Sequence, residues 1–459
     1  MHRAHVAARF PDPSHRLTVA DTLFTTDAMR AIFTERAGLQ RMLDFEAALA
    51  RAEAATGVIP TAAAPAIARH CRAENYDLEA IRSAARNAGN LAIPMVAALT
   101  RAVATDGGDA KGFVHWGATS QDAIDTGLVL QLRDALDLID ADVARLIRAL
   151  REQTLGHRAT VLAGRTWLQQ ALPVTLGLKF AGTLDAMERH RARLSALRPR
   201  VLVLQLGGAA GTLASLGTRG PAVADALAAE LQLAVAAVPW HTQRDSVCEV
   251  ATTLGLVVAT LGKLARDLSL LAQSEVGEAF EAAAPGRGGS STLPHKRNPV
   301  GAAIALSAAV RVPNLVATML SAAVQEHERG LGNWPAEWDT LPEIALLAAG
   351  ALDAMANTVA SLEVDAARMR ANLDLLQGLL LAEAVQMALA PTLGRDVAHS
   401  LVGAASREAI AQKRHLRDVL AAQPQVRAVL DDDALAKLFD PAGYLGATQT
   451  FIDRTVAPR

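Results

Sequence analysis

The sequence predicts an all-α protein whose long helices pack lengthwise against one another. Hydrophobic residues make up 51% of the 459 residues, and many of them are Ala and Leu. Aromatic residues make up only 3%. This aliphatic composition favours helices. Between Leu254 and Leu271, apolar residues recur at alternating steps of three and four, which places them on one stripe of a helix. Strand signals are scarce, and helices of this length usually form a bundle.

The order of the segments predicts three helical domains. We expect an N-terminal helical domain over residues 1–112, in which residues 1–16 form a loose extension. A central bundle of long helices occupies residues 113–362, and a smaller helical domain occupies residues 363–459. The long helices are expected at about 122–158, 173–198, 240–278, 299–326 and 336–362.

Several of these helices carry apolar residues on more than one face, for example over residues 302–310 and 344–352. Such helices need packing partners on all sides, which predicts burial between subunits of an oligomer. A large monomeric bundle is the alternative.

Charge, cysteine and histidine content exclude several classes of protein. A formal net charge of -2, without a dense run of Lys and Arg among aromatic residues, argues against nucleic acid as a partner. Cys71 and Cys248 are too few and too separated for a disulfide framework or a structural zinc site, so we expect both to be buried and unreactive. The histidines show no metal pattern such as HExxH, and we expect no metal and no cofactor.

No segment predicts a membrane span or a secretory signal. Residues 201–218 are uncharged, but several glycines make them a poor spanning helix. Residues 1–16 contain no apolar core of a signal peptide. We therefore expect a soluble cytoplasmic protein.

The segment 288–299, GGSSTLPHKRNP, concentrates groups that can bind and transform a small anion. Ser290, His295 and Lys296 place a hydroxyl, an imidazole and an ammonium group on one glycine-rich segment. Asn298 can cap the helix that Pro299 begins, and the free N–H groups of a helix start attract anions. A solvated loop with an ordinary helix cap is the alternative, but the complete string favours a functional site.

The segment 115–122, HWGATSQD, has the pattern of a helix N-terminus. Thr119 or Ser120 can cap the helix, and Asp122 lies in its first turn. The hydroxyls and backbone donors would face one spot of the size of a carboxylate, next to His115.

Together with two further segments, these strings resemble the fumarase/aspartase superfamily. Residues 288–299 match its loop GSSxMPxKxNP except for Leu293, and residues 115–122 match HxGxTSxD. Residues 164–177, GRTWLQQALPVTLG, resemble GxTHxQxAxPxTxG, and residues 325–338, QEHERGLGNWPAEW, resemble WHERD(I/L)SxSSxER. The resemblance implies a long-helix bundle that forms a homotetramer, with each active site shared between three subunits.

Two departures from these patterns point to one branch of the superfamily. Trp167 stands where the lyases have a His that moves protons, and Trp338 stands where nucleotide-type lyases have an Arg. The chain is in this respect similar to the bacterial branch that closes muconates into lactones. The resemblance implies that a carboxylate of 3-carboxy-cis,cis-muconate, a tricarboxylate of protocatechuate breakdown, adds across a double bond to give 4-carboxymuconolactone. The substrate-binding residues implied are His115, Thr119, Ser120, Arg165, Thr166, Trp167, Gln169, Asn298, Arg329 and Trp338.

The resemblance also implies candidates for the proton donor. The serine equivalent to Ser290 is the base of the lyases, so in the reverse sense of reaction it can be the acid. Lys296 and the helix start would then have to stabilise the serine anion. His295, Lys296 itself and His115 remain rival donors.

Two other functions remain open. One is a fumarate-releasing lyase of the adenylosuccinate or argininosuccinate type, which a His at position 167 would favour. The other is a non-catalytic relative resembling lens crystallins, and the intact Ser290, Lys296 and Asn298 argue against it.

Overall fold

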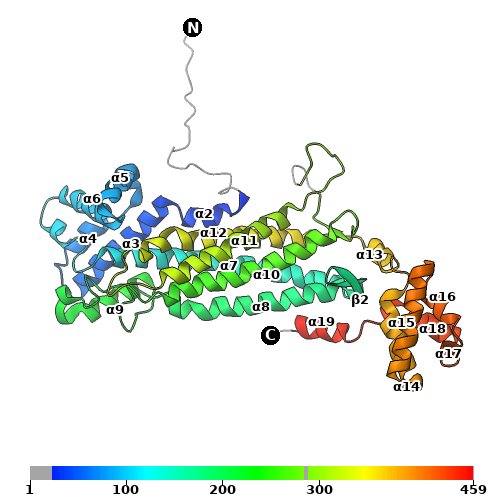
Figure 1. Cartoon of the computed structure of the whole chain (residues 1–459). Coiled ribbons are helices and arrows are strands. Elements are labelled where there is room, and N and C mark those ends of the chain that lie inside the picture. Colours follow the sequence, from blue (N-terminus) through cyan, green and yellow to red (C-terminus); the bar gives the residue numbers. More distant parts are fainter. Residues whose placement is uncertain (1–22, 284–287, 458–459) are drawn as a thin grey trace, which may run out of the picture. The chain divides into compact units, whose positions relative to one another are not determined.

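The computed structural model describes residues 23–283 and 288–457, and helices dominate these residues (Figure 1). The N-terminal extension expected over residues 1–16 lies outside them. Contacts between residues divide the chain into two compact units. Unit 1 comprises Met1–Asp142, His190–Ala259 and Ser307–Asp353, and unit 2 comprises Val143–Arg189, Thr260–Leu306 and Ala354–Arg459. The three-domain division stays a prediction.

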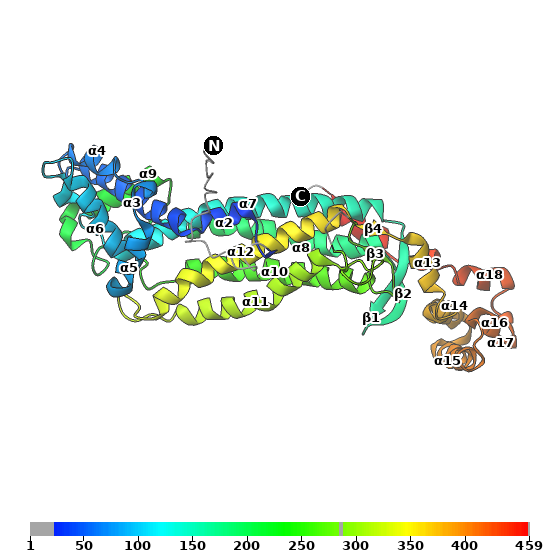
Figure 2. The same cartoon turned by 90° about the horizontal axis from the view of Figure 1, so that it is seen from above.

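Long helices contribute a segment to each unit, and within each unit these segments run side by side (Figure 1 and Figure 2). They are α7 (Ser120–Gly156), α8 (Leu176–Val201), α10 (Asp245–Leu271), α11 (Val300–Ala322) and α12 (Asn333–Ala360). Their buried residues are almost all aliphatic, such as Leu136, Leu184, Val257 and Leu352. The predicted all-α bundle is thereby confirmed.

Helix α10 begins later than predicted because the segment before it is held by other contacts. The backbone N–H of Trp240 donates to Gln205 Oε1 at 3.0 Å, and its indole Nε1 donates to the Leu204 carbonyl at 3.0 Å. Residue 240 therefore belongs to a fixed loop. At the other end, residues 279–280 form strand β3 (Ala279–Phe280), which pairs antiparallel with β4 (Glu363–Val364).

A β-hairpin precedes α8 where no strand was predicted. Strands β1 (Val161–Thr166) and β2 (Gln169–Thr175) pair antiparallel. The two turn residues, Trp167 and Leu168, have positive φ values of 52° and 64°. A two-residue hairpin turn requires this left-handed backbone, for which Asn-Gly is the usual sequence signal. Trp-Leu carries no such signal, which explains why the sequence did not predict the hairpin.

The N-terminal part of unit 1 is a compact layer of short helices around α3 (Glu35–Ala55). Leu43, Met95 and Leu99 lie in its aliphatic core. Thr34 caps α3 by accepting from the Ala37 N–H at 3.1 Å. The surrounding helices are α2 (Asp27–Ile32), α4 (Ala63–Ala68), α5 (Leu78–Ala88), α6 (Ala92–Ala104) and α9 (Gly220–Leu231).

The C-terminal part of unit 2 is a second set of short helices with its own core. Val385, Val402 and Leu416 are fully or almost fully buried there. The helices around this core are α14 (Ala382–Leu393), α15 (Arg395–Gln412), α16 (Leu416–Ala421), α17 (Pro424–Arg427) and α18 (Asp432–Leu438). Unit 2 also contains α13 (Ala366–Leu373), which contacts β1, and α19 (Thr448–Val456), whose Gln449 and Asp453 accept from Arg158.

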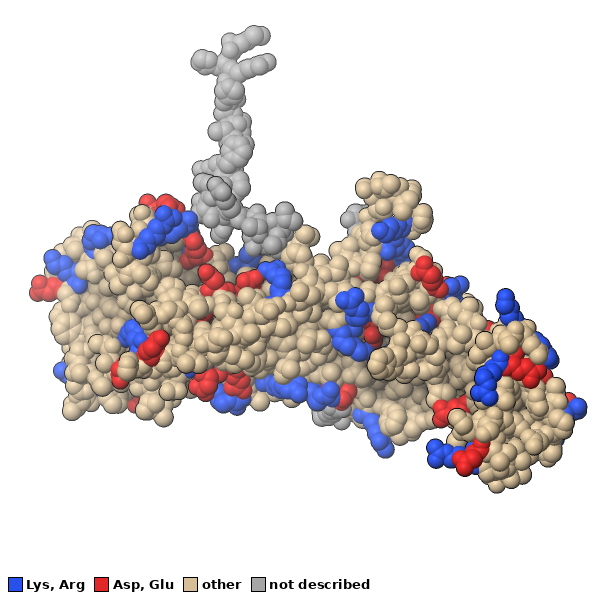
Figure 3. Space-filling view, viewed as in Figure 1, with Lys and Arg blue, Asp and Glu red and all other residues tan. Residues whose placement is uncertain are grey.

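Within the described ranges, α10, α11 and α12 are long and apolar enough to cross a membrane by length and composition. Their most apolar stretches differ in how far the chain itself buries them, at 61% for α10 and 72% for α12 but only 28% for α11. Charged side chains of both signs are interspersed on the face shown in Figure 3. Helix α11 therefore presents an apolar surface that the described residues leave uncovered.

Candidate active site

The residues predicted for the site fall into two groups, one in each unit. Unit 1 contains His115, Thr119, Ser120, Arg329 and Trp338. Unit 2 contains Arg165, Thr166, Trp167, Gln169, Ser290, His295, Lys296 and Asn298.

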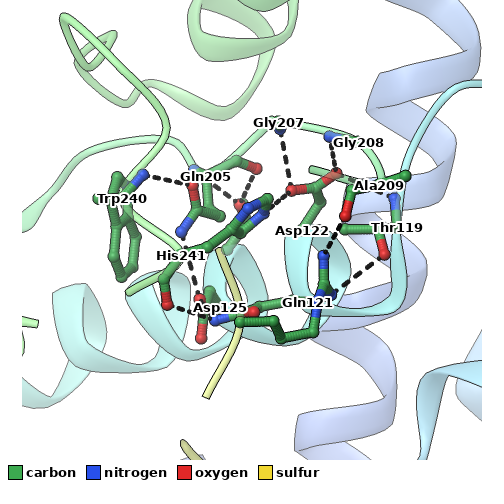
Figure 4. Close-up of polar contacts among 12 residues, drawn as sticks. Thr119, Gln121, Asp122, Asp125, Gln205, Gly207, Gly208, Ala209, Trp240 and His241 are labelled. Atoms are coloured by element: carbon green, nitrogen blue, oxygen red, sulfur yellow. Dashed lines mark hydrogen bonds and ion pairs between the residues drawn. The ribbon is translucent and has the colours of Figure 1, made fainter. Parts of the chain in front are cut away.

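In unit 1, the buried carboxylate of Asp122 holds two loops together (Figure 4). It accepts the backbone N–H groups of Thr119 at 2.9 Å and of Gly207 and Gly208 at 3.0 Å each. Nε2 of the buried His241 lies 2.7 Å from Asp122 Oδ1. A carboxylate in the first turn of a helix that accepts the N–H of the residue just before that helix is half of a capping box. Asp122 thus fixes residues 115–120 against the loop that contains Gly207 and Gly208.

Thr119 or Ser120 was expected to cap α7; Thr119 directly precedes the helix, and its hydroxyl accepts from Arg329. Arg329 Nη1 donates to Thr119 Oγ1 at 3.2 Å, and Nη2 donates to the Ala209 carbonyl at 3.1 Å (Figure 4). Ser120 is the first residue of α7 and is half-buried. These contacts leave N–H donors of the guanidinium for another acceptor, and no carboxylate of the described residues pairs with its positive charge. The pair is suited to hold a substrate carboxylate.

A fully buried ion cluster supports this loop. Arg244 Nη1 donates to Asp125 Oδ2 at 2.8 Å, and Arg244 Nε donates to Glu337 Oε1 at 3.1 Å. The indole Nε1 of Trp334 donates to Asp125 Oδ1 at 3.0 Å. Burial raises the pKa of Glu337, and Arg244 opposes that rise. The cluster ties α7 and α12 to the segment that precedes α10.

Three tryptophans of unit 1, Trp240, Trp334 and Trp338, lie around this network. Trp240 and Trp334 are buried and brace the polar network, and Arg244 Cζ lies 4.9 Å from the centre of the Trp240 ring. Trp338 packs edge-on against Trp334 at 4.9 Å between ring centres. It lines a cavity of about 240 Å³ together with Leu39 and other residues of α3 and α7. Its substrate-binding role stays a prediction.

His115 is held by a residue that the sequence did not single out. Nδ1 of its ring lies 2.6 Å from Oε1 of Glu46, whose side chain is fully buried on α3. The backbone of His115 has a φ of 57°, in the left-handed region that few non-glycine residues adopt. Burial lowers the pKa of His115, but the carboxylate of Glu46 outweighs this and the pKa is raised, with a smaller contribution from Asp122.

In unit 2, Arg165 is already paired. Its two terminal nitrogens donate to the two carboxylate oxygens of Glu278 at 2.9 and 2.7 Å. Glu278 is fully buried and also accepts from the Asn372 amide at 2.7 Å. We predicted Arg165 as an anion holder, but a bidentate ion pair balances its charge in this structure. A substrate carboxylate would have to compete with Glu278.

The other residues of the hairpin lie at its exposed tip. Thr166 and Gln169 face each other at the ends of β1 and β2. Trp167 is 95% exposed and Leu168 is also largely exposed. Bulky, exposed side chains are uncommon in a left-handed turn. Where such backbone strain does occur, it is concentrated at functional sites.

Among residues 288–299, Ser290 is set apart by its hydrogen bonds. Its Oγ accepts the backbone N–H groups of Thr292 at 3.3 Å and Leu293 at 3.0 Å. His295 and Lys296 lie on the same segment and are exposed. Two amide donors aimed at one hydroxyl oxygen stabilise negative charge on that oxygen.

The predicted Asn298 cap is wrong, because Glu281 occupies the start of α11. Oε2 of Glu281 accepts from the Gly301 N–H at 3.0 Å, and Oε1 accepts from the Ala302 N–H at 2.8 Å. The Asn298 side-chain amide instead donates to the Gly289 carbonyl at 3.3 Å. The N–H groups that we expected to bind a substrate anion are thus taken by a carboxylate of the chain.

Sequence reasoning missed the acidic residues that organise the site. Glu46, Asp125, Glu278 and Glu281 were not singled out, yet each positions a residue or segment of the predicted motifs. For Glu46 a signal exists, since a carboxylate on the apolar face of a helix is uncommon unless it is paired. Within the ranges that the structure describes, no three His, Cys, Asp or Glu side chains are grouped so as to hold a metal ion.

Known proteins match the chain over nearly its whole length. A family model described as Lyase matches residues 22–314, and one described as Adenylosuccinate lyase C-terminus matches residues 378–455. The 3-carboxy-cis,cis-muconate cycloisomerase of Pseudomonas aeruginosa is 56% identical over 437 residues, covering 95% of each chain. The crystal structure of 3-carboxy-cis,cis-muconate lactonizing enzyme from Pseudomonas putida has a TM-score of 0.91 at 55% identity, covering 95% of this chain and 98% of that one. The crystal structure of beta-carboxy-cis,cis-muconate cycloisomerase from Acinetobacter calcoaceticus has the same TM-score, 0.91, at 43% identity, covering 96% of this chain and 99% of that one.

The chain belongs to the lyase family of the fumarase/aspartase superfamily. Its fold is that of the muconate-lactonising members whose crystal structures it matches.

Proposed function

We propose that this protein is an enzyme that cycloisomerises 3-carboxy-cis,cis-muconate. The observation that carries this conclusion is the identity of 56% over 95% of the chain with the Pseudomonas aeruginosa cycloisomerase. Position 167 agrees with it. A fumarate-releasing lyase must protonate a departing amine, and an indole cannot take or give a proton at neutral pH. We infer that the product is 4-carboxymuconolactone.

The reaction requires no covalent bond between the protein and the substrate. A carboxylate oxygen of the substrate forms a bond to one carbon of a double bond, and the π-electron pair moves to the other carbon and into its carboxylate. A proton then adds to that carbon. Because nucleophile and acceptor are parts of one molecule, tethering supplies the proximity. The protein has to hold three carboxylates, stabilise the developing charge and deliver one proton.

The Arg329–Thr119 pair is our first candidate for holding a substrate carboxylate. It presents a guanidinium that no carboxylate within residues 23–283 and 288–457 neutralises, next to a hydroxyl and the start of α7. His115 and Lys296 are further cations in the matched motifs. Arg165 is a weaker candidate because it is bound to Glu278.

Ser290 is our candidate for the proton donor. After donation its oxygen would carry negative charge, and the amides of Thr292 and Leu293 already point at that oxygen. This support comes from neighbouring backbone rather than from the start of α11, which Glu281 occupies. His295, Lys296 and His115 remain the rivals.

We propose a homotetramer with active sites shared between subunits and a cytoplasmic location. Two observations support the assembly. Helix α11 exposes Val310 and Leu320 on a surface that the chain leaves uncovered, and the hairpin tip exposes Trp167 and Leu168. Large exposed apolar patches usually mark protein–protein contacts.

A test with the substrates of the alternative lyases separates this function from the lyase alternative. The purified protein would be incubated with adenylosuccinate and with argininosuccinate, and fumarate would be measured. We expect no release above the uncatalysed rate. Fumarate release from either compound would show that Trp167 does not exclude lyase chemistry and would overturn the proposal.

A further inference from the structure

The function described so far gives no role to Glu46, the buried carboxylate of unit 1 that contacts His115. Glu46 lies in the middle of α3, with only 1% of its surface exposed. Its Oε1 lies 2.6 Å from His115 Nδ1, and within the described part of the chain its Oε2 has no hydrogen-bond partner. Burying a carboxylate is costly unless it is paired, so this contact compensates for the burial of Glu46.

The contact determines which ring nitrogen of His115 remains for a ligand. A histidine that donates through Nδ1 to a carboxylate presents Nε2 on the opposite side of the ring. His115 precedes the first turn of α7, and Asp122 fixes the same loop from the other end. Glu46 on α3 therefore holds the imidazole, and Asp122 on α7 fixes the backbone of the loop that carries it.

Glu53, seven residues after Glu46 on the same face of α3, provides a contrast. It is fully buried, and neither carboxylate oxygen has a hydrogen-bond partner among the described residues. Burial, with a contribution from the neighbouring Glu46, raises the pKa of Glu53 to about 9. Glu53 is therefore neutral at pH 7, whereas Glu46 has the imidazole of His115 as its partner.

We propose that Glu46 is a positioning residue for the cycloisomerisation, which holds His115 as an imidazolium with Nε2–H directed to a substrate carboxylate. The proposal rests on the function proposed above. The groups that face His115 are Glu46 on α3 and Asp122 on α7, both acidic. Glu53 and the buried thiol of Cys71 face Glu46 and remain protonated at neutral pH, since burial raises the pKa of Cys71 to about 12.

The first test measures the state of His115 without substrate. In protein labelled with ring-¹³C histidine, NMR would follow the His115 signal, assigned by its loss in His115→Asn, as the pH rises. We expect a midpoint above 6.5 in the wild type and a midpoint at least about one pH unit lower in Glu46→Gln. Glu53→Gln is the matched control, because it changes a buried carboxyl that is already neutral, and it should leave the midpoint within about 0.3 units.

The second test asks whether this state matters for turnover. If the imidazolium binds substrate, kcat/KM falls as the pH rises through the pKa of His115. Glu46→Gln should then lose about tenfold or more at pH 8 but less than about threefold at pH 6, because a one-unit fall in pKa removes nine-tenths of the cation. Glu46→Asp should recover part of the loss. In a His115→Asn background, Glu46→Gln should have no further effect, since the two residues act as a unit.

Each outcome decides the proposal. An unchanged His115 midpoint in Glu46→Gln would overturn it, even if that variant were less active. A loss of kcat/KM that is equal at all pH values, or that persists in the His115→Asn background, would show a merely structural role and would also overturn it. Absence of muconate turnover in the wild type would count against the proposed function, whereas the NMR titration would still decide whether Glu46 holds the imidazolium.

Discussion

At Ser290 the hydroxyl oxygen accepts two backbone N–H groups, while the side chains of His295 and Lys296 on the same segment are exposed. This arrangement favours the serine anion without a charged partner. The sequence could predict which serine matters, through its place in the motif. It could not predict the two amide donors, because they depend on the turn that residues 290–293 adopt.

Replacing Ser290 by Ala should remove the proton donor and little else. We expect kcat to fall by more than about a hundredfold, with KM within about threefold of the wild-type value. Steady-state kinetics on 3-carboxy-cis,cis-muconate would measure both. Ser291→Ala is the matched control on the adjacent exposed residue, and it should retain most of the activity. Near-normal turnover by Ser290→Ala would transfer the role to one of the rival donors.

The neutral carboxyl of Glu53 predicts an unusual pH dependence of stability. Its folded-state pKa of about 9 lies above the ordinary value of 4.5, so between these two values the folded state binds more protons than the unfolded state. Stability therefore falls as the pH rises through this window. Glu53→Gln removes the cost of burying an ionisable group and should raise Tm by a few degrees at pH 8, with the difference shrinking towards pH 5. Thermal unfolding scans at both pH values would measure it, and a lower Tm of the variant at pH 8 would contradict the account.

At the scale of elements, the long helices followed from apolar periodicity alone, whereas their ends did not. Helix α10 starts at Asp245 because the preceding residues bind Gln205 and Leu204. The β1–β2 hairpin was missed because its turn lacks glycine. The cap of α11 comes from Glu281, which lies well before the helix in the sequence, and not from Asn298 beside the helix start. The late start of α10 and the cap of α11 involve contacts between residues far apart in the sequence, which local propensity does not report.

The ion cluster that joins α7 to α12 should be essential for folding. Arg244→Leu leaves Asp125 and Glu337 buried without their partner, and we expect the free energy of unfolding to fall by about 3–5 kcal/mol. Arg244→Lys should rescue little, because an ammonium cannot bridge two carboxylates in the same geometry. Urea unfolding would measure the changes.

The matched control for Arg244 is an ion pair on the surface of the same unit. Arg51 Nε lies 2.9 Å from Glu230 Oε2, with both side chains partly exposed to solvent. Arg51→Leu should change the free energy of unfolding by less than about 1 kcal/mol. Equal effects of the two substitutions would contradict the role given to the buried cluster.

At the scale of the whole molecule, α11 is the element that a single chain leaves incomplete. Its most apolar stretch is only 28% buried. Val310, within the helix, is 71% exposed, and Val324, just beyond the end of the helix, is 76% exposed. The sequence indicated this surface through apolar residues on several faces of one helix. It could not indicate which surfaces meet there, because that depends on side-chain complementarity between copies.

A charge on this surface should break the assembly. We expect the wild type to have about four times the mass of one chain by light scattering after size exclusion, and Val310→Asp to shift it to dimers or monomers. Ile410→Asp, at an exposed apolar position of α15, is the control and should keep the wild-type mass. A wild-type monomer, or a tetramer that survives Val310→Asp, would contradict the assembly proposed here.

The central claim is that this chain closes a muconate into a lactone. The most direct measurement is to mix the purified protein with 3-carboxy-cis,cis-muconate, without added metal or cofactor, and to follow the loss of diene absorbance while NMR identifies the product. We predict rapid loss of the diene and appearance of 4-carboxymuconolactone at a matching rate. A diene that persists at the uncatalysed rate, or that is consumed without forming a lactone, would contradict the account.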